Sequence, residues 1–281
     1  MSYKIVIDSC GELPNELKKD KRFESVPLGL EVGDYSIMDD ESFDQALFLK
    51  KVAESPACPK SSCPSPEKYM NAYHCEAENV FVVTLSRNLS GSYNSAELGK
   101  KLYMETYGEK NIHIVDSESA SGGETQIALL AMELSDQGMA YDEICKQLDE
   151  YRDNMKTYFV LDNLETLRKN GRLTGVKAFV ASTLNIKPVM GTDGDGNIIQ
   201  LSQAIGIKKG LKKMVETILN DIKFTDDKRL IITHTNALAR AELVRDMLFE
   251  KAKFADVIIM DTAGISSMYA NNGGIIITIR R

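Results

Sequence analysis

The chain has 281 residues, which is enough for two domains or for one large one. Acidic residues outnumber basic ones by 41 to 34, so no overall positive field would attract the phosphates of a nucleic acid. The five cysteines are scattered without a CxxC pair and the three histidines lie far apart, so we expect free thiols in the cytoplasm and no metal site.

The first half of the chain alternates short apolar runs with helical patterns. Strands are predicted at residues 3–8 (YKIVID), 79–85 (NVFVVTL) and 111–116 (NIHIVD). Helical patterns follow them at residues 12–20, 92–108, 124–138 and 141–155. Because the strands are rich in Val and Ile and barely alternate with polar residues, they are typical of a parallel sheet buried on both faces, as in a Rossmann-like domain.

The second half indicates a mixed α/β domain. Strands are predicted at residues 157–163, 230–235 and 273–281, and a hairpin with the turn DGDG at 185–204. Helices are expected at about 206–221 and 236–251. We therefore predict two α/β domains, at residues 1–155 and 156–281. No segment has the apolar length of a membrane span, and the opening residues are interpreted as a strand rather than as a signal peptide.

All three strand-to-helix loops of the first half are rich in serine, at a sheet edge where helix N-termini would favour an anion. Two of them contain the S-x-x-E pattern of a helix capping box. These are Ser9 with Glu12 and Ser121 with Glu124, and we interpret both serines as caps.

The third loop, NLSGSY, has no acidic residue at the box position. Its hydroxyls, Ser90 and Ser92, flank Gly91, where a ligand could approach closely. A nucleophilic serine would need a base, yet no G-x-S-x-G motif occurs and no histidine is placed near Ser90 by its spacing. Hydrogen-bond donation is the simpler role. A serine-dependent esterase or acyltransferase using Ser90 stays as the alternative, and an anion sensor as a third.

Other motifs are absent or weak. There is no phosphate-binding G-x-x-x-x-G-K-[ST] loop and no G-x-G-x-x-G, so no nucleotide cofactor is expected. The DGDGN run lacks the glutamate that completes a calcium loop, so we interpret it as a hairpin turn.

Six stretches, taken together, resemble the DegV family of bacterial fatty-acid-binding proteins over the whole chain. They occur in the order of that family: IVIDSCGELP, KSSCPSPEKY, LSRNLSGSYNSA, IHIVDSESASGGE, VLDNLETLRKNGRLTG and LNIKPVMGTDGDGNI. The resemblance implies two α/β domains with a ligand tunnel between them. It also implies a long-chain fatty acid whose carboxyl group is presented to a separate ATP-binding kinase subunit, without catalysis by this chain.

The same resemblance implies the site residues. The family's carboxyl-binding hydroxyls map onto Ser61 and Ser90, and the arginine of its GGR pattern onto Arg172, near the expected kinase contact. Tyr269, in YANNG, stands where the family has a head-group histidine. A phenol can donate a hydrogen bond to a carboxylate but carries no positive charge near neutral pH.

Overall fold

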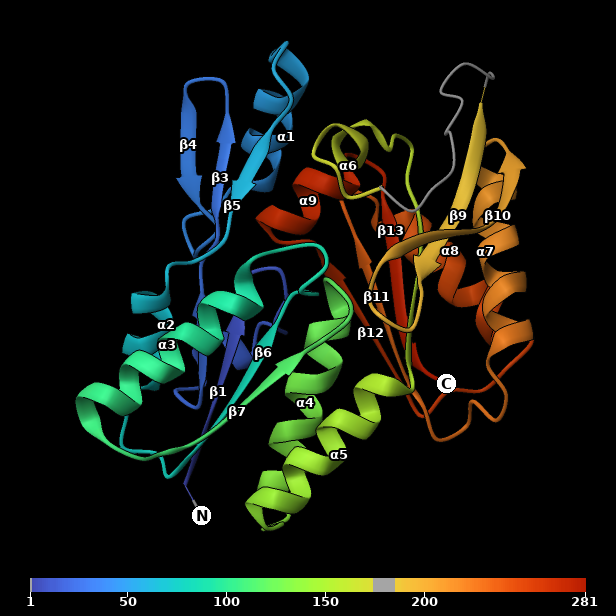
Figure 1. The fold of residues 1–281 in the computed structure, drawn as a ribbon. Coiled ribbons are helices and arrows are strands. Elements are labelled where there is room, and N and C mark those ends of the chain that lie inside the picture. The colour runs from blue at the N-terminus through green and yellow to red at the C-terminus, as the bar shows by residue number, and fades with distance from the viewer. Residues whose placement is uncertain (1, 174–184) are drawn as a thin grey trace.

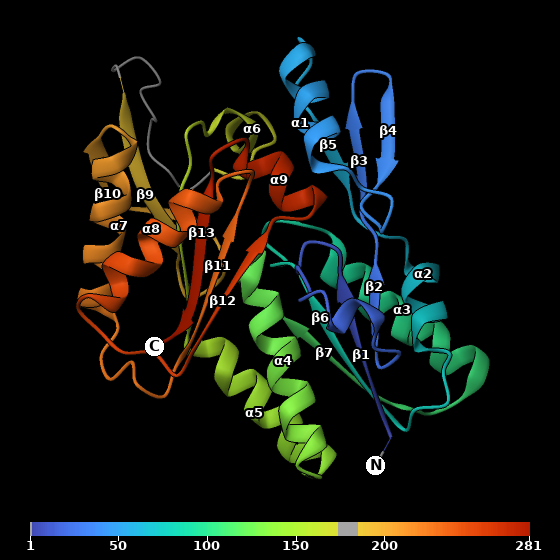
Figure 2. The same ribbon diagram turned by 180° about the vertical axis from the view of Figure 1, so that it is seen from behind.

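The computed structural model describes residues 2–173 and 185–281. Two α/β lobes lie side by side, and helix α4 (Gly122–Asp136) runs between their sheets (Figures 1 and 2). Helix α4 belongs to the first lobe in sequence but also packs on the second, where Gln126 Nε2 donates to the carbonyls of Arg229 (3.0 Å) and Thr278 (3.1 Å). This helix is therefore the structural bridge between the lobes.

The first lobe contains the parallel sheet that the sequence predicts. Its strand order is β2-β1-β6-β7, with all pairs parallel. The strands are β1 (Tyr3–Asp8), β2 (Phe23–Val26), β6 (Asn79–Thr84) and β7 (Asn111–Asp116). Helices α2 (Pro66–Tyr73) and α3 (Ser92–Tyr107) cover one face, while α4 and α5 (Tyr141–Asp153) cover the other. Alternate side chains of β1 enter both cores, which explains the continuous apolar run.

The prediction of a helix at residues 12–20 is wrong. That stretch contains only a 3₁₀ helix at Leu17–Lys19. The expected capping box is absent as well, because Ser9 Oγ accepts a hydrogen bond from the amide of Leu28 (3.1 Å), a residue of the neighbouring loop. The Ser9 hydroxyl therefore has a hydrogen-bond partner in tertiary structure instead of at the N-terminus of a helix.

A small antiparallel sheet and one helix extend from the first lobe without having been predicted. The sheet has the order β4-β3-β5, formed by β3 (Gly29–Val32), β4 (Tyr35–Met38) and β5 (Lys60–Ser62). Helix α1 (Gln45–Glu54) lies beside it (Figure 1). This sheet matters for function because Ser61 lies on β5, opposite Leu30 of β3.

The second lobe is built on a six-stranded mixed sheet, which confirms the predicted fold class. Its order is β10-β9-β8-β13-β11-β12. The strands are β8 (Met155–Val160), β9 (Ile186–Thr192), β10 (Ile198–Ile205), β11 (Arg229–His234), β12 (Asp256–Asp261) and β13 (Ile275–Arg280). Helices α7 (Ile207–Asp221) and α8 (Leu238–Phe249) cover one face. Strand β12 and the short helices α6 (Glu165–Lys169) and α9 (Gly264–Ala270) were not predicted.

The two faces of this sheet have different neighbours. Along β8, Tyr158 and Val160 pack into the core under α7 and α8. Successive side chains of a strand point to opposite faces, so Thr157 and Phe159 point away from that core, toward the first lobe. Strand β8 is also where the second sheet begins. The division into two domains at residue 155 stays a prediction. Helix α4 packs on both lobes, so contacts across this division are extensive.

Candidate functional site

A mainly apolar cavity lies where the two lobes meet. The space that admits the centre of a water-sized sphere is about 80 Å³, so the cavity is narrow. The first lobe lines it with residues from the loops that follow β1, β6 and β7, and the second lobe with residues of its sheet, α6 and α9. The lining residues are Cys10, Leu85, Leu89, Ala120, Thr157, Phe159, Leu161, Leu167, Arg172, Thr192, Ile198, Ile265, Ser266, Tyr269, Ala270 and Ile276.

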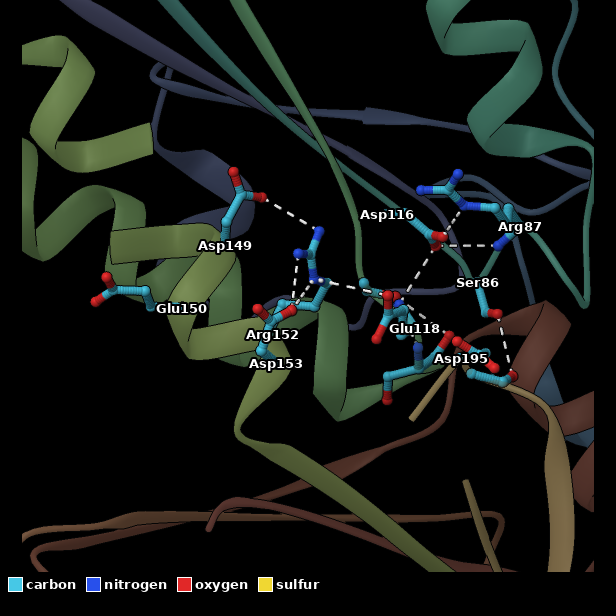
Figure 3. A network of polar contacts seen from close by, with 12 residues as sticks. Ser86, Arg87, Asp116, Glu118, Asp149, Glu150, Arg152, Asp153 and Asp195 are labelled. Carbon is cyan, nitrogen blue, oxygen red and sulfur yellow. Dashed lines mark hydrogen bonds and ion pairs between the residues drawn. The ribbon is translucent and has the colours of Figure 1, made fainter. Parts of the chain in front are cut away.

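The β9–β10 hairpin turn docks on the first lobe, next to the cavity residues Thr192 and Ile198. Ser86 Oγ donates to the carbonyl of Gly196 (3.1 Å), and Asn88 Nδ2 donates to that of Asp195 (2.7 Å). Gly196 has a φ of +78°, and a Cβ there would lie 2.7 Å from the Cα of Glu118, so the close approach requires glycine. Figure 3 shows the turn beside Glu118 and the charged network around it.

That charged network braces the loops under the hairpin. Arg87 forms an ion pair with the buried carboxylate of Asp116, whose Oδ1 also accepts from the Arg87 amide at 3.0 Å (Figure 3). Arg152 lies 3.8 Å from Glu118 and 2.8 Å from Asp153. Burial raises the pKa of the Glu118 carboxyl, with the Arg152 charge opposing it. The network is a structural support, because none of these residues lines the cavity.

At another part of the cavity, three of the predicted site residues meet. Tyr269 on α9 and Ser61 on β5 lie within hydrogen-bonding distance, with 3.1 Å between their hydroxyl oxygens. The Arg172 guanidinium carbon lies 5.9 Å from the centroid of the Tyr269 ring. The Arg172 guanidinium donates to the carbonyls of Leu89 (3.1 Å) and Asn170, and no ion pair with a carboxylate is found for it within residues 2–173 and 185–281. The arrangement offers hydroxyl donors and one cation beside apolar walls.

The serine loop lies next to this group, but its members differ in what they contact. Ser90 follows the cavity residue Leu89, and its Oγ accepts from the amide of Ser92 (3.2 Å). A Cβ on Gly91 would lie 3.0 Å from the sulfur of Cys63, two residues beyond Ser61. The loops carrying Ser61 and Ser90 are therefore neighbours. A role of Ser90 and Gly91 in ligand binding stays a prediction.

Ser92 is fully buried on the side of the core. Its Oγ donates to Asp8 Oδ2 (2.5 Å) and lies 2.6 Å from the hydroxyl of Tyr69. Asp8 Oδ2 also accepts from the amide of Leu85 (2.9 Å). Ser92 is absent from the cavity lining, so its visible contacts tie helix α3 to strand β1. The predicted ligand contact of Ser92 gains no support from this position.

Two buried carboxylates of the first lobe hold α9, the helix that carries Tyr269. Asp39 accepts from the amides of Gly264 (2.7 Å) and Ile265 (2.9 Å), and Glu12 Oε1 accepts from that of Ala263 (3.1 Å). Burial raises the pKa of Asp39 to about 6 and that of Glu12 to about 7, with these amide donors opposing the shift. Asp39 and Glu12 therefore hold helix α9, and with it Tyr269, in place beside the cavity.

The predicted capping box at Ser121 is also wrong, and Glu12 explains why. Ser121 is the N-cap residue of α4 but makes no side-chain capping bond. Its Oγ instead donates to Glu12 Oε2 (2.7 Å) and lies 2.7 Å from Thr233 Oγ1 of β11. Glu124, the other half of the pattern, is buried, and burial raises the pKa of its carboxyl. Ser121 therefore joins the two lobes through hydrogen bonds instead of capping α4.

The contacts of the histidines do not support a serine nucleophile. The His74 ring lies tilted against the Tyr107 ring, with 4.4 Å between their centroids; His113 Nε2 lies 3.4 Å from Asp149, and His234 Nδ1 lies 3.2 Å from Asp261. No histidine of the described chain contacts Ser90 or lines the cavity. The described residues also contain no group of three His, Cys, Asp or Glu side chains arranged to hold a metal ion.

The fold and the site together define a two-lobed α/β protein with a mainly apolar cavity between its lobes and hydroxyl groups beside that cavity. The chain belongs to the DegV family, because the profile of this family of uncharacterised proteins matches residues 2–279. A DegV domain-containing protein of Streptococcus gordonii is 35% identical over 279 residues, which cover 98% of each chain.

Solved structures of the same family have the same fold. A DegV family protein from Ruminococcus gnavus, refined with vaccenic acid, is 51% identical with a TM-score of 0.96, covering 99% of both chains. The fatty acid kinase (Fak) B3 protein of Streptococcus pneumoniae, loaded with linoleic acid, is 31% identical with a TM-score of 0.90, covering 100% of this chain and 99% of the other. In the described part of the present chain, no helix is both long and apolar enough to span a membrane.

Proposed function

We propose that this protein binds one long-chain fatty acid in the cavity between the lobes, with the carboxyl group at Ser61, Ser90, Tyr269 and Arg172. The observation that carries the proposal is a mainly apolar cavity lined by Tyr269 and Arg172, with the hydroxyl of Ser61 within hydrogen-bonding distance of Tyr269. The bound fatty acids of the R. gnavus and S. pneumoniae relatives support it. No catalytic residue is assigned to this chain.

The acyl tail would supply most of the binding energy. Burial of each methylene group contributes about 0.8 kcal/mol, so a long chain gains on the order of ten kcal/mol before the cost of ordering it. The hydroxyls and Arg172 then fix the orientation of the carboxylate, since charge-assisted hydrogen bonds are directional. A ligand bound in this way is held mainly by its tail and positioned by its head.

The second half of the proposal is that the protein presents the carboxyl group to a partner kinase. The S. pneumoniae relative is a fatty acid kinase B3 protein, which supports this role. The surface around Arg172 is the proposed contact, because this partly buried residue lines the cavity and carries a positive charge. We place the protein in the cytoplasm, which agrees with its five free cysteines.

Mass spectrometry of the purified protein after denaturation tests the binding step. We expect a long-chain fatty acid in about equal molar amount to the protein. A protein that carries no fatty acid, and takes none up from solution after delipidation, would contradict the proposal.

Labelling with a fluorophosphonate probe tests the esterase alternative. That alternative requires an adduct on Ser90, whereas the binding proposal predicts no adduct.

Tyr269→Phe is expected to weaken fatty acid binding about three- to ten-fold, since the phenol hydroxyl would donate one hydrogen bond to the carboxylate. Titration calorimetry or displacement of a fluorescent fatty acid measures the effect. Tyr107→Phe is the matched control, because Tyr107 is a half-exposed tyrosine on α3 that does not line the cavity. Equal affinities of the two variants would show that the Tyr269 hydroxyl does not contact the ligand.

A further inference from the structure

Two threonines, Thr157 and Thr192, line the part of the cavity wall that β8 and β9 form. On β8, Thr157 and Phe159 line the cavity, followed by Leu161 just beyond the strand. Gly274 places Leu161 beside helix α9, because a Cβ on this glycine would lie 2.8 Å from Ala270 Cβ and 3.0 Å from Leu161 Cδ2. Leu161 and Thr157 are four positions apart along the extended chain, a distance of about 13 Å. Thr157 therefore marks the end of the cavity remote from the head-group residues.

The strand register places Thr192 beside Thr157. In the β8–β9 ladder Phe159 pairs with Met190 and Tyr158 with Gly191, so the next pair along the strands is Thr157 with Thr192. Thr192 also pairs with Ile198 of β10, which lines the cavity as well. Two threonines thus lie together on the inner face of the sheet, at the base of the hairpin that docks on the first lobe.

The polar groups of this region differ in whether they have partners. Thr157 Oγ1 lies 2.6 Å from Ser119 Oγ. Thr192 also lines the cavity and is only 9% exposed, and its hydroxyl makes no side-chain hydrogen bond to another described residue. An unsubstituted acyl chain passing this point would leave the hydroxyl unpaired, which is unfavourable in an apolar site.

We propose that Thr192 is a specificity-determining residue that favours fatty acids with an oxygen substituent, a hydroxyl or keto group, in the middle of the acyl chain. This inference rests on the proposed function and on its orientation of the ligand. The Thr192 hydroxyl donates to a keto or hydroxyl oxygen of the ligand, or accepts from a ligand hydroxyl. This hydrogen bond replaces the one that the ligand substituent made to water before binding. Because Thr192 lies remote from Tyr269, the substituent must be well removed from the carboxyl group.

The test compares octadecanoic acid with 10-hydroxyoctadecanoic acid on the delipidated full chain. The measured quantity is the ratio of their dissociation constants, in the wild type and in Thr192→Val. Valine keeps the shape of threonine and favours a strand, so the fold is retained. We expect the preference for the hydroxy acid to fall about five-fold in Thr192→Val, the size of one net hydrogen bond. Thr192→Ser, which keeps the hydroxyl, is expected to retain the preference.

Each other result has a defined meaning. The same ratio in the wild type and in Thr192→Val would overturn the assignment of Thr192. A 3-hydroxy acid serves as the positional control: its affinity relative to octadecanoic acid should not depend on residue 192, and an equal dependence would overturn the mid-chain position. Failure of the wild type to bind octadecanoic acid and both hydroxy acids would instead refute the proposed function itself.

Discussion

Glu12→Gln is expected to remove roughly 2–3 kcal/mol of the pH dependence of the free energy of unfolding between pH 5 and pH 8. Glu12 is buried at the contact of the two lobes, where it accepts hydrogen bonds from Ser121 and from the amide of Ala263. Burial raises the pKa of its carboxyl from 4.5 to about 7. A glutamine oxygen can still accept from Ala263, so the variant keeps the main contact without a titrating group.

The sign follows from the raised pKa. Between pH 4.5 and pH 7 the folded chain keeps the Glu12 proton that the unfolded chain has lost, so the folded state binds more protons. Stability due to Glu12 is therefore greatest at acidic pH, falls as the pH rises through this window, and is constant above it. Relative to the wild type, Glu12→Gln becomes progressively more stable from pH 5 to pH 8.

Urea unfolding at a series of pH values measures the difference between the two proteins. Glu16→Gln is the matched control, since Glu16 is an exposed glutamate four residues away, and its curve should run parallel to that of the wild type. Parallel curves for Glu12→Gln and the wild type would mean that the Glu12 carboxyl titrates alike in the folded and unfolded chains.

Most of the framework was predictable from the sequence because it depends on local patterns. The apolar runs of β1, β6 and β7 identify a parallel sheet, since only strands covered on both faces need to be apolar throughout. The small sheet of β3, β4 and β5 escaped prediction because its strands are three or four residues long and partly exposed. Such strands lack a periodic signal, and their apolar residues are buried by packing with α1 and α9 in one core.

The candidate site was predictable only in part. Ser61 and Tyr269 meet although they are 208 residues apart in sequence, and only the family resemblance brought them together. Glu12 and Ser121 were assigned to helix caps because S-x-x-E is a local pattern, whereas burial between two lobes is a tertiary property. Thr192 was not identified, since a threonine at the end of a strand looks the same in sequence whether it faces a core or a cavity.

Removal of the bound fatty acid is expected to lower the melting temperature by about 5–10 °C. A ligand that binds only the folded chain stabilises it by about 2.7 kcal/mol when the free ligand is at a hundred times its dissociation constant, and more at higher excess. For a chain of this size each kcal/mol corresponds to about 2–4 °C. The physical basis is that both lobes line the cavity, so the acyl chain adds contacts that are lost on unfolding.

Differential scanning calorimetry of the protein before and after delipidation, and after reloading with octadecanoic acid, measures this shift. Butanoic acid is the control ligand: it offers the same carboxyl group to Ser61 and Tyr269 but too little chain to fill the cavity, so it should restore almost none of the lost stability. Equal recovery with butanoic and octadecanoic acids would mean that the head group, and not the tail, supplies the binding energy. An unchanged melting temperature throughout would mean that no fatty acid occupies the space between the lobes.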